Sequence, residues 1–301
     1  MVWVIGSKGM LGSEIVKQLE LNEISFIGTD REVDITNQTE LDSFAAKNPG
    51  INWIVNCAAY TDVEKAEAEI ELAEKLNAAG AGNIAKTANM IGAKMIHIST
   101  DYVFDGKGKT PYTEIMPISP LGVCGRTKAE GERLVQENLE DSYIFRTAWL
   151  YGPRGKNFVY TMVNLMNTRS EISVVNDQFG SPTCTIDLSR YIIMVILGGQ
   201  EIPGNPHPNV MPGIYHCSGE GEASWYDFAC EIYKIGKQKG LIKNECNIKP
   251  CSTEEYGAAV ERPVYSVLAK AKLKKALQTK LPSWQESLRA FMASPMFREQ
   301  P

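Results

Sequence analysis

Positive charge, histidine and long apolar runs are all scarce in this sequence. Its 301 residues include 31 lysines and arginines against 36 aspartates and glutamates, for a net charge of −5, with only three histidines. No basic block is present to neutralise a row of phosphates, which excludes nucleic acids and anionic membrane surfaces as expected partners. The apolar run 192–198 is far shorter than the ~20 residues of a membrane-spanning helix, and residues 1–6 lack the basic start of a signal peptide. We therefore expect a cytoplasmic protein.

Cysteines with the spacing of metal ligands are also missing. The seven cysteines form an odd, scattered set that lies mostly inside apolar patterns, and the histidines do not cluster with them. Such a set is typical of free thiols in a reducing cytoplasm, and it predicts no zinc site. The cysteines are Cys57, Cys124, Cys184, Cys217, Cys230, Cys246 and Cys251.

What the sequence does contain is an alternation of strand and helix patterns, which predicts an α/β fold with a doubly wound parallel sheet. The length allows one large domain or two modest ones. In the first half we expect strands at 2–5, 24–28, 53–56 and 94–98, and helices at 10–20, 38–47 and 63–91, the last broken near Gly80. In the second half we expect helices at 157–167, 185–197, 224–239 and 269–292, the last interrupted at 281–282, and strands at 171–175 and 214–217. Residues 198–212 are rich in proline and glycine, as exposed connections are.

The first strand leads directly into a glycine turn and a helix. Gly6 would permit the tight turn, Gly9 would let the backbone approach a pyrophosphate, and Gly12 would allow close packing of helix and strand. Phosphates would then lie at the helix N-terminus. For this glycine spacing alone, an ordinary glycine-rich turn without a ligand is an equally good explanation.

The cofactor preference is left open by two neighbouring residues. Asp30 follows the second predicted strand, where an acid would bond the adenosine ribose and favour NAD. Arg31, with Lys8, could instead pair with a 2′-phosphate and favour NADP.

The stretch from Ser99 to Lys128 carries the pattern of a reductase site. Thr100 ends a buried strand, where its hydroxyl could hold a carbonyl oxygen, and Lys128 lies in a helix predicted over Thr127–Glu137. Position 124 lies one helical turn before Lys128, where such a site has a proton donor whose pKa the lysine lowers. That donor is normally tyrosine, and here it is Cys124.

Seven segments together resemble the dTDP-4-dehydrorhamnose reductase family of the extended short-chain dehydrogenase superfamily. They cover nearly the whole chain, and the run Asn176–Thr183 is far more specific to this family than the glycine turn. The segments are 99–106, 120–132, 145–152, 157–158, 174–183, 213–216 and 261–263. The resemblance implies a Rossmann-type dinucleotide-binding domain over residues 1–150. A smaller, mainly substrate-binding domain over 151–301 would interleave with it.

The resemblance also implies an activity and a set of site residues. The activity is NADPH- or NADH-dependent reduction of the 4-keto group of a dTDP-linked 6-deoxysugar, and a homodimer is left open. The catalytic residues would be Thr100, Cys124 and Lys128. The cofactor-binding residues would be Gly6, Gly9, Met10, Leu11, Gly12, Asp30, Arg31, Asp34, Ile35, Ala58, Ala59, Tyr60, Lys65 and Lys128. The substrate-binding residues would be Thr100, Asp101, Tyr102, Trp149, Asn176, Gln178 and Arg262.

Four of these assignments have a simpler alternative. Lys65 could lie on a solvated helix face, Trp149 could be a buried indole, and Arg262 could form a surface ion pair. Residues 34–35 could be an ordinary loop that leads into a helix cap.

The chain departs from the family at Cys124, where the family has tyrosine, and at Gly122, where it usually has asparagine. A cysteine has a reference pKa of about 8.5 against about 10 for tyrosine, so acidity is not the obstacle. A thiol is too short to touch the same carbonyl oxygen without a water between, and loss of a placed acid costs ~10²–10⁴ in rate. Three interpretations remain: a slow reductase that uses water or Tyr102, a cofactor-binding protein without catalysis, or a substitution particular to this chain. An epimerase or dehydratase is disfavoured by the match over 176–183.

Overall fold

A six-stranded parallel sheet is built from five early strands and one strand from much later in the chain. The computed structural model describes residues 1–198 and 208–298, and it gives the strand order β10-β5-β4-β3-β1-β2. The strands are β1 (Val2–Ile5), β2 (Phe26–Thr29), β3 (Trp53–Asn56), β4 (Lys94–Thr100), β5 (Ser142–Thr147) and β10 (Gly213–His216). The predicted doubly wound, Rossmann-type α/β fold is therefore confirmed.

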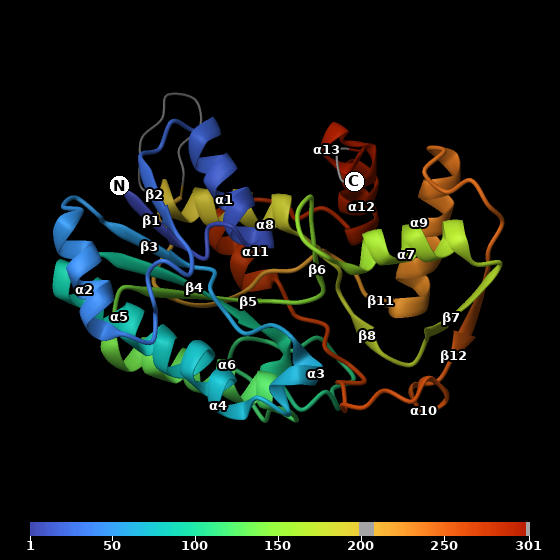
Figure 1. Ribbon diagram of the computed structural model, residues 1–301, viewed down its shortest axis with the longest axis horizontal. Coiled ribbons are helices and arrows are strands. Elements are labelled where there is room, and N and C mark those ends of the chain that lie inside the picture. Colours follow the sequence, from blue (N-terminus) through green and yellow to red (C-terminus); the bar gives the residue numbers. More distant parts are fainter. Residues whose placement is uncertain (199–207, 299–301) are drawn as a thin grey trace.

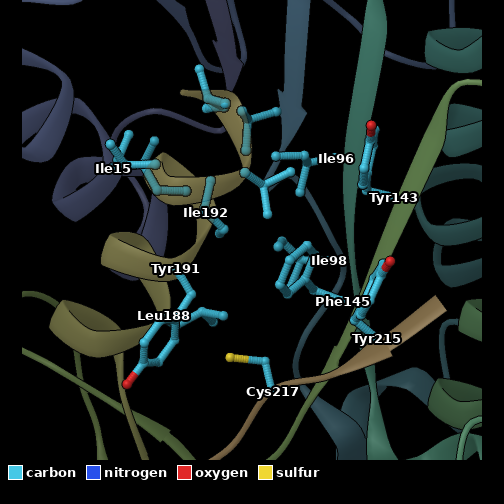
Figure 2. Close-up of a cluster of buried hydrophobic side chains, with 14 of the residues drawn as sticks. Ile15, Ile96, Ile98, Tyr143, Phe145, Leu188, Tyr191, Ile192, Tyr215 and Cys217 are labelled. Carbon is cyan, nitrogen blue, oxygen red and sulfur yellow. The ribbon is translucent and has the colours of Figure 1, made fainter. Parts of the chain in front are cut away.

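Helices cover both faces of this sheet (Figure 1). One layer consists of α1 (Met10–Leu21), α8 (Thr185–Ile196) and α11 (Ala271–Leu277), and its apolar residues share one buried cluster with the strands. Figure 2 shows this cluster, in which Ile96 and Ile98 of β4 lie near Ile192 of α8. The opposite layer consists of α2 (Gln38–Lys47), α5 (Gly80–Ile91) and α6 (Val123–Asn138). Burial on both faces explains why the strands are apolar without alternation.

The second half builds a separate lobe beside the sheet (Figure 1). Its core is rich in aromatic residues and joins α7 (Phe158–Thr168), α9 (Trp225–Gln238) and α12 (Trp284–Ala293) through side chains such as Phe228 and Phe291. Short strand pairs complete it: β6 (Leu150–Tyr151) with β9 (Thr183–Cys184), β7 (Glu171–Val175) with β12 (Asn247–Cys251), and β8 (Phe179–Gly180) with β11 (Ala223–Ser224). The last elements are α10 (Thr253–Tyr256) and α13 (Pro295–Arg298).

The later segments β10, α8 and α11 pack on the first sheet, so the two halves of the chain are intertwined. The division near residue 150 stays a prediction. Strand β12 was not predicted, because the sequence Asn-Ile-Lys-Pro-Cys is polar and contains a proline. Residues 199–207 of the predicted connection lie outside the described residues. No helix in the described ranges is both long and apolar enough to cross a membrane.

The predicted break of the helical region 63–91 near Gly80 is wrong. The helix is interrupted earlier, between α3 (Val63–Ala66) and α4 (Ile70–Glu74), and a π-helical turn at Lys75–Ala79 then runs without interruption into α5. Gly80 is needed for packing, since a Cβ atom there would lie 2.8 Å from Cδ1 of Ile35. The glycine therefore marks a close contact inside a continuous helix.

A buried ion pair fastens α6 to the sheet. Nη2 of Arg146 on β5 lies 2.6 Å from Oε2 of Glu132 on α6, and both side chains are only 3% exposed. The Ser99 hydroxyl on β4 donates to the other carboxylate oxygen of Glu132 at 2.5 Å. The carboxylate thereby joins two neighbouring strands to the helix that carries Cys124 and Lys128.

Replacing Glu132 with glutamine should destabilise the protein strongly, because it leaves the buried Arg146 without its counter-charge. Loss of one partner of a buried ion pair costs ~3–5 kcal/mol. Urea denaturation followed by circular dichroism would measure the loss. The control is Arg133→Ala, since Arg133 is the next residue on α6 and its ion pairs are exposed; this change should hardly move the denaturation midpoint. A Glu132→Gln midpoint equal to that of the control would contradict the prediction.

Candidate active site

The glycine turn forms a narrow cradle at the carboxyl end of β1. Gly6 has a φ of +76°, a left-handed conformation that favours glycine, and a Cβ atom there would lie 2.8 Å from the Ala58 nitrogen. A Cβ atom at Gly12 would lie 2.1 Å from the Gly6 carbonyl oxygen. Helix α1 begins at Met10 after Gly9, and no side chain caps it. Its first backbone N–H groups, including those of Met10 and Leu11, are therefore available to an anionic group.

The segment after β3 lies directly beside this cradle. Ala58 and Ala59 have small side chains, and Asn56 accepts a hydrogen bond from the Ala58 N–H at 3.0 Å. Asn77, in the π-helical turn, holds both the N–H and the carbonyl of Tyr60, at 2.8 and 3.1 Å. These hydrogen bonds fix the backbone of residues 58–60 beside the glycine turn. No signal in the sequence identified Asn77.

The residues after β2 keep both cofactor preferences open. The Asp30 carboxylate accepts the backbone N–H groups of Lys8 at 3.2 Å and of Arg31 at 3.0 Å. Backbone hydrogen bonds hold the pKa of the Glu32 carboxyl below its ordinary value. The Lys8 ammonium, which forms an exposed ion pair with Glu32 at 3.4 Å, lowers this pKa further.

Asp34 and Ile35 have structural tasks in this loop. The Asp34 carboxylate accepts hydrogen bonds from the hydroxyl of Thr36 at 2.8 Å and from the backbone N–H of Thr36 at 2.9 Å. These bonds form a local turn. Ile35 is buried against Gly80 of α5. These contacts agree with the loop interpretation, and a contact with adenine stays a prediction.

Lys128 contacts β4 two residues before Thr100, near the strand end at which the sequence predicts both residues. Lys128 is buried, and its ammonium donates to the carbonyl oxygen of Ile98 at 2.5 Å, two residues before Thr100 on the same strand. Burial lowers the pKa of Lys128 to about 8, while Cys124 and Glu132 act in the opposite direction. Near neutral pH the lysine is therefore still mostly protonated, and it places a positive charge beside Thr100.

Cys124 lies one turn before Lys128 on α6, which begins at Val123 rather than at the predicted Thr127. Burial raises the pKa of its thiol above the ordinary value, although Lys128 lowers it. Gly122 supplies no side-chain cap for this helix, and Oε1 of Glu67 accepts the Val123 N–H at 2.7 Å instead. A Cβ atom at Gly122 would lie 2.8 Å from that oxygen. The Glu67 carboxylate therefore occupies the space that a larger side chain at position 122 would need.

Asp101 and Tyr102 follow Thr100 in a short 3-10 turn. The Thr100 hydroxyl donates to Oδ1 of Asp101 at 2.9 Å and accepts the Tyr102 N–H at 3.2 Å. Burial raises the pKa of Tyr102 well above its ordinary value, with a further contribution from Asp101; Cys124 raises it slightly and Arg262 lowers it. The charges of Arg262 and Cys124 thus act on the Tyr102 hydroxyl.

Trp149 follows β5 with a φ of +48°, a strained conformation for a bulky residue. Its ring stacks on Trp225 of α9, with centroids 3.5 Å apart, and a Cβ atom at Gly180 would lie 2.5 Å from its Cε2. The Trp149 indole is half-buried, so its burial favours neither the substrate-binding interpretation nor the buried-indole interpretation of the sequence. Trp225 was not predicted, and only its place in an amphipathic helix signalled a packing role.

The predicted nucleotide-binding residues are spread over two segments of the second half. Asn176 is exposed, whereas Gln178 is buried and donates to the Thr253 hydroxyl at 3.1 Å. Nη2 of Arg262 lies 3.2 Å from Oε1 of Glu64 on α3, so this ion pair links the second half to the first. Nε of Arg262 is buried and has no hydrogen-bond partner among the described residues.

Lys65 lies apart from the other predicted cofactor residues. Its side chain is 69% exposed and pairs with Asp62 at 3.4 Å. This position agrees with the solvated-face interpretation, and a contact with cofactor stays a prediction.

Taken together, these residues form a site at the carboxyl ends of parallel strands, where open α/β sheets bind ligands. The glycine cradle, which could hold a diphosphate, follows β1. The Thr100 hydroxyl, which could donate to a carbonyl oxygen, and the buried Lys128 ammonium lie at β4, two strands away in the sheet. Such an arrangement can bind a dinucleotide and polarise a carbonyl group.

Known proteins share both the sequence and the fold. The family model described as RmlD substrate binding domain matches residues 1–296. The spore coat polysaccharide biosynthesis protein SpsK of Bacillus subtilis (strain 168) is 40% identical, over 97% of this chain and 96% of that protein. The dTDP-4-dehydrorhamnose reductase of Escherichia coli (strain K12) is 36% identical, over 97% and 96%. The crystal structure of the dTDP-4-dehydrorhamnose reductase of Bacillus anthracis in complex with NADP has 38% identity and a TM-score of 0.88, over 97% and 98%. The chain therefore belongs to the RmlD family, that of the dTDP-4-dehydrorhamnose reductases which its sequence resembles.

Proposed function

We propose that this protein reduces the 4-keto group of a dTDP-linked 6-deoxysugar, in the manner of dTDP-4-dehydrorhamnose conversion to dTDP-rhamnose, with NADPH or NADH. The observation that carries the proposal is the position of the buried Lys128 ammonium, which binds the Ile98 carbonyl of β4 two residues before Thr100, on a strand that only β3 separates from β1 and its glycine cradle. Relatives that are named as reductases of this class support it.

The chain's own residues fit a dinucleotide cofactor. The space that a Cβ atom would fill at Gly6 and Gly12, and the uncapped start of α1, suit a diphosphate that approaches the backbone closely. Ala58, Ala59 and Tyr60 would line the same groove, and Asp30 or Arg31 would contact the adenosine ribose. When bound, the reduced cofactor supplies the hydride for the carbonyl carbon.

Three residues would prepare the substrate carbonyl. Thr100 would donate its hydroxyl proton to the C4 oxygen, which stabilises negative charge as it develops there. Lys128 would hold the nicotinamide ribose and add positive charge close to the reacting atoms. Trp149 would place its free edge or face against the deoxysugar, since Trp225 already covers one face of the ring. Arg262, now paired with Glu64, would exchange that partner for the nucleotide part of the substrate.

The missing tyrosine favours one alternative. A cofactor-binding, non-catalytic or regulatory homologue would keep the cradle and Lys128 but would not need a placed proton donor at position 124. Cys124 is the observation that supports this alternative, and turnover with dTDP-4-keto-6-deoxyglucose separates the two. We place either function in the cytoplasm, because the seven cysteines are free. A homodimer stays a prediction of the resemblance.

The cofactor prediction rests on Arg31 and Asp30. Arg31→Ala should weaken NADPH binding by about tenfold or more, because a hydrogen bond between charged groups contributes ~1.5–3 kcal/mol, and it should leave NADH binding unchanged. Titrations of both cofactors, followed by fluorescence and by thermal stability, would measure the effect, with Arg133→Ala as the control for loss of an exposed arginine. If neither cofactor binds the folded wild-type protein, the assignment fails.

The catalytic prediction concerns position 124. Cys124→Tyr should raise turnover by one or more powers of ten, since a placed acid contributes ~10²–10⁴ in rate. The Michaelis constant should change little, because the gain belongs to the transition state. Single-turnover oxidation of NADPH with dTDP-4-keto-6-deoxyglucose would measure it.

Two further variants control this experiment. Cys124→Phe introduces the same ring without the hydroxyl and should give no gain. Lys128→Met in the tyrosine variant should remove most of the gain. A tyrosine variant that folds and binds cofactor, yet stays inactive on every dTDP-ketosugar tried, would favour the non-catalytic homologue.

A further inference from the structure

Asp101 has a buried carboxyl group that forms no ion pair with any residue in the described ranges. The residue is only 2% exposed, and among the described residues its Oδ2 atom makes no hydrogen bond of normal geometry, although the Ser266 hydroxyl lies near enough to the carboxyl group to lower its pKa. Its Oδ1 atom accepts the Thr100 hydroxyl at 2.9 Å. Glu132, another buried carboxylate beside the sheet, is neutralised by Arg146. An ionised carboxylate in the position of Asp101 is costly, and the cost disappears when the group holds a proton.

The surroundings of Asp101 agree with a carboxyl group that holds its proton more tightly than usual. Burial raises the pKa of Asp101 to about 6, and the hydroxyls of Ser266 and Thr100 with nearby backbone N–H groups only partly oppose this. The ionisable groups that face it are Tyr102 on its own turn and Cys124 on α6. The segment that contains Ser266 contributes a hydroxyl, and its Arg262 acts on Tyr102.

We propose that Asp101 donates the proton of the reduction through the hydroxyl of Thr100, in place of the tyrosine that position 124 lacks. This inference rests on the proposed reductase function. As hydride from the reduced cofactor forms the new C–H bond, the carbonyl π electrons become an oxygen lone pair. That oxygen takes the Thr100 hydroxyl proton, and the Thr100 oxygen takes the Asp101 carboxyl proton. The products are an alcohol, the oxidised cofactor and an Asp101 carboxylate, which takes up one proton (H⁺) from the solvent before the next turnover.

The hydrogen bonds of Thr100 suit this relay. Its hydroxyl oxygen already accepts the Tyr102 N–H at 3.2 Å and lies 2.9 Å from Oδ1 of Asp101. When a substrate carbonyl accepts the hydroxyl proton, the oxygen can accept a second hydrogen bond from protonated Asp101. The hydroxyl then has one donor and two acceptor positions in use, which is its full capacity.

The other neutral acids nearby are poorer donors. Burial raises the pKa values of both Tyr102 and Cys124, so each gives up its proton less readily than in water. Lys128 already donates to the Ile98 carbonyl. With a pKa of about 6, Asp101 keeps a proton in roughly a tenth of the molecules at pH 7, and it transfers that proton more readily than a phenol does.

The first test is the pH dependence of turnover in the wild-type protein and in Asp101→Asn, measured as initial single-turnover rates of NADPH oxidation between pH 5.5 and 8.5. The wild-type rate should fall about tenfold for each pH unit above 6, because only protonated Asp101 can donate. Asp101→Asn should be at least tenfold slower at pH 6 and should show no fall in rate between pH 6 and pH 7, since Lys128, with a pKa of about 8, loses its proton mainly above that range. Asp105→Asn is the matched control, since Asp105 lies in the same loop and accepts a hydrogen bond from the Tyr112 hydroxyl. This substitution should leave both the rate and its pH profile unchanged.

The second test repeats Asp101→Asn in the Cys124→Tyr variant. A tyrosine that donates directly makes the relay unnecessary, so the effect of Asp101→Asn should shrink to less than about threefold. An equal loss in both backgrounds would mean that Asp101 only maintains the site, and the proposal would fall. A wild-type protein that does not turn over while Cys124→Tyr does would also overturn it, and would leave the reductase function standing. Inactivity of both would remove the reductase function and the relay together.

A third measurement needs no turnover. Because the folded-state pKa of Asp101 is raised above its unfolded value, its protonation adds stability that is present at low pH and is lost as the pH rises through about 6. In the cofactor-free protein, Asp101→Asn should therefore raise the melting temperature relative to wild type more at pH 7.5 than at pH 4.5, because asparagine carries no charge at either pH. A difference in melting temperature that does not change with pH would show that Asp101 has an ordinary pKa, and the proposal would fail.

Discussion

The buried ion pair between Glu132 and Arg146 is the constraint on which the site depends. The carboxylate of Glu132 joins α6 to β5 through Arg146 and to β4 through Ser99. The proposed catalytic residues lie on β4 and α6, with Thr100 one residue after Ser99 and Lys128 one helical turn before Glu132. A shift of α6 against the sheet would therefore separate the Lys128 ammonium from the end of β4. A buried ion pair adds little net stability compared with apolar packing, but its hydrogen bonds fix a geometry.

The second half of the chain completes the site from the opposite side. Its segments contribute β10 to the sheet and cover one face with α8 and α11, so its lobe is anchored at several points along the chain. From that anchored lobe, Trp225 supports Trp149, and Arg262 reaches Glu64 of the first half. A substrate that lies between the halves would replace contacts such as this ion pair, which is partly exposed, so water screens it and lowers the cost of breaking it.

The sequence predicted the elements that repeat a simple pattern and missed those that depend on distant contacts. Apolar strand runs and the glycine turn located β1, β3, β4 and the start of α1, because burial on both faces dictates their composition. The break assigned to Gly80 failed because a helix tolerates glycine where a neighbour such as Ile35 needs the space. The placement of Thr100 and Lys128 followed from strand end and helix spacing. Neither Asn77 nor Glu67 could be found this way, since their partners Tyr60 and Val123 are fixed only by the tertiary fold.

The substitution at position 124 also changes what Lys128 can do. Beside a tyrosine, a buried lysine lowers the pKa of the phenol and so makes proton donation easier. Beside Cys124, whose own pKa is raised by burial, the same charge acts on a group that cannot reach a carbonyl oxygen. The lysine keeps its hydrogen bond to Ile98 near the end of β4, so in the proposed reaction its charge would act on the developing alkoxide. Hydride transfer and proton transfer therefore depend on different residues in this site, and a protein that has lost the usual proton donor can retain everything that hydride transfer requires.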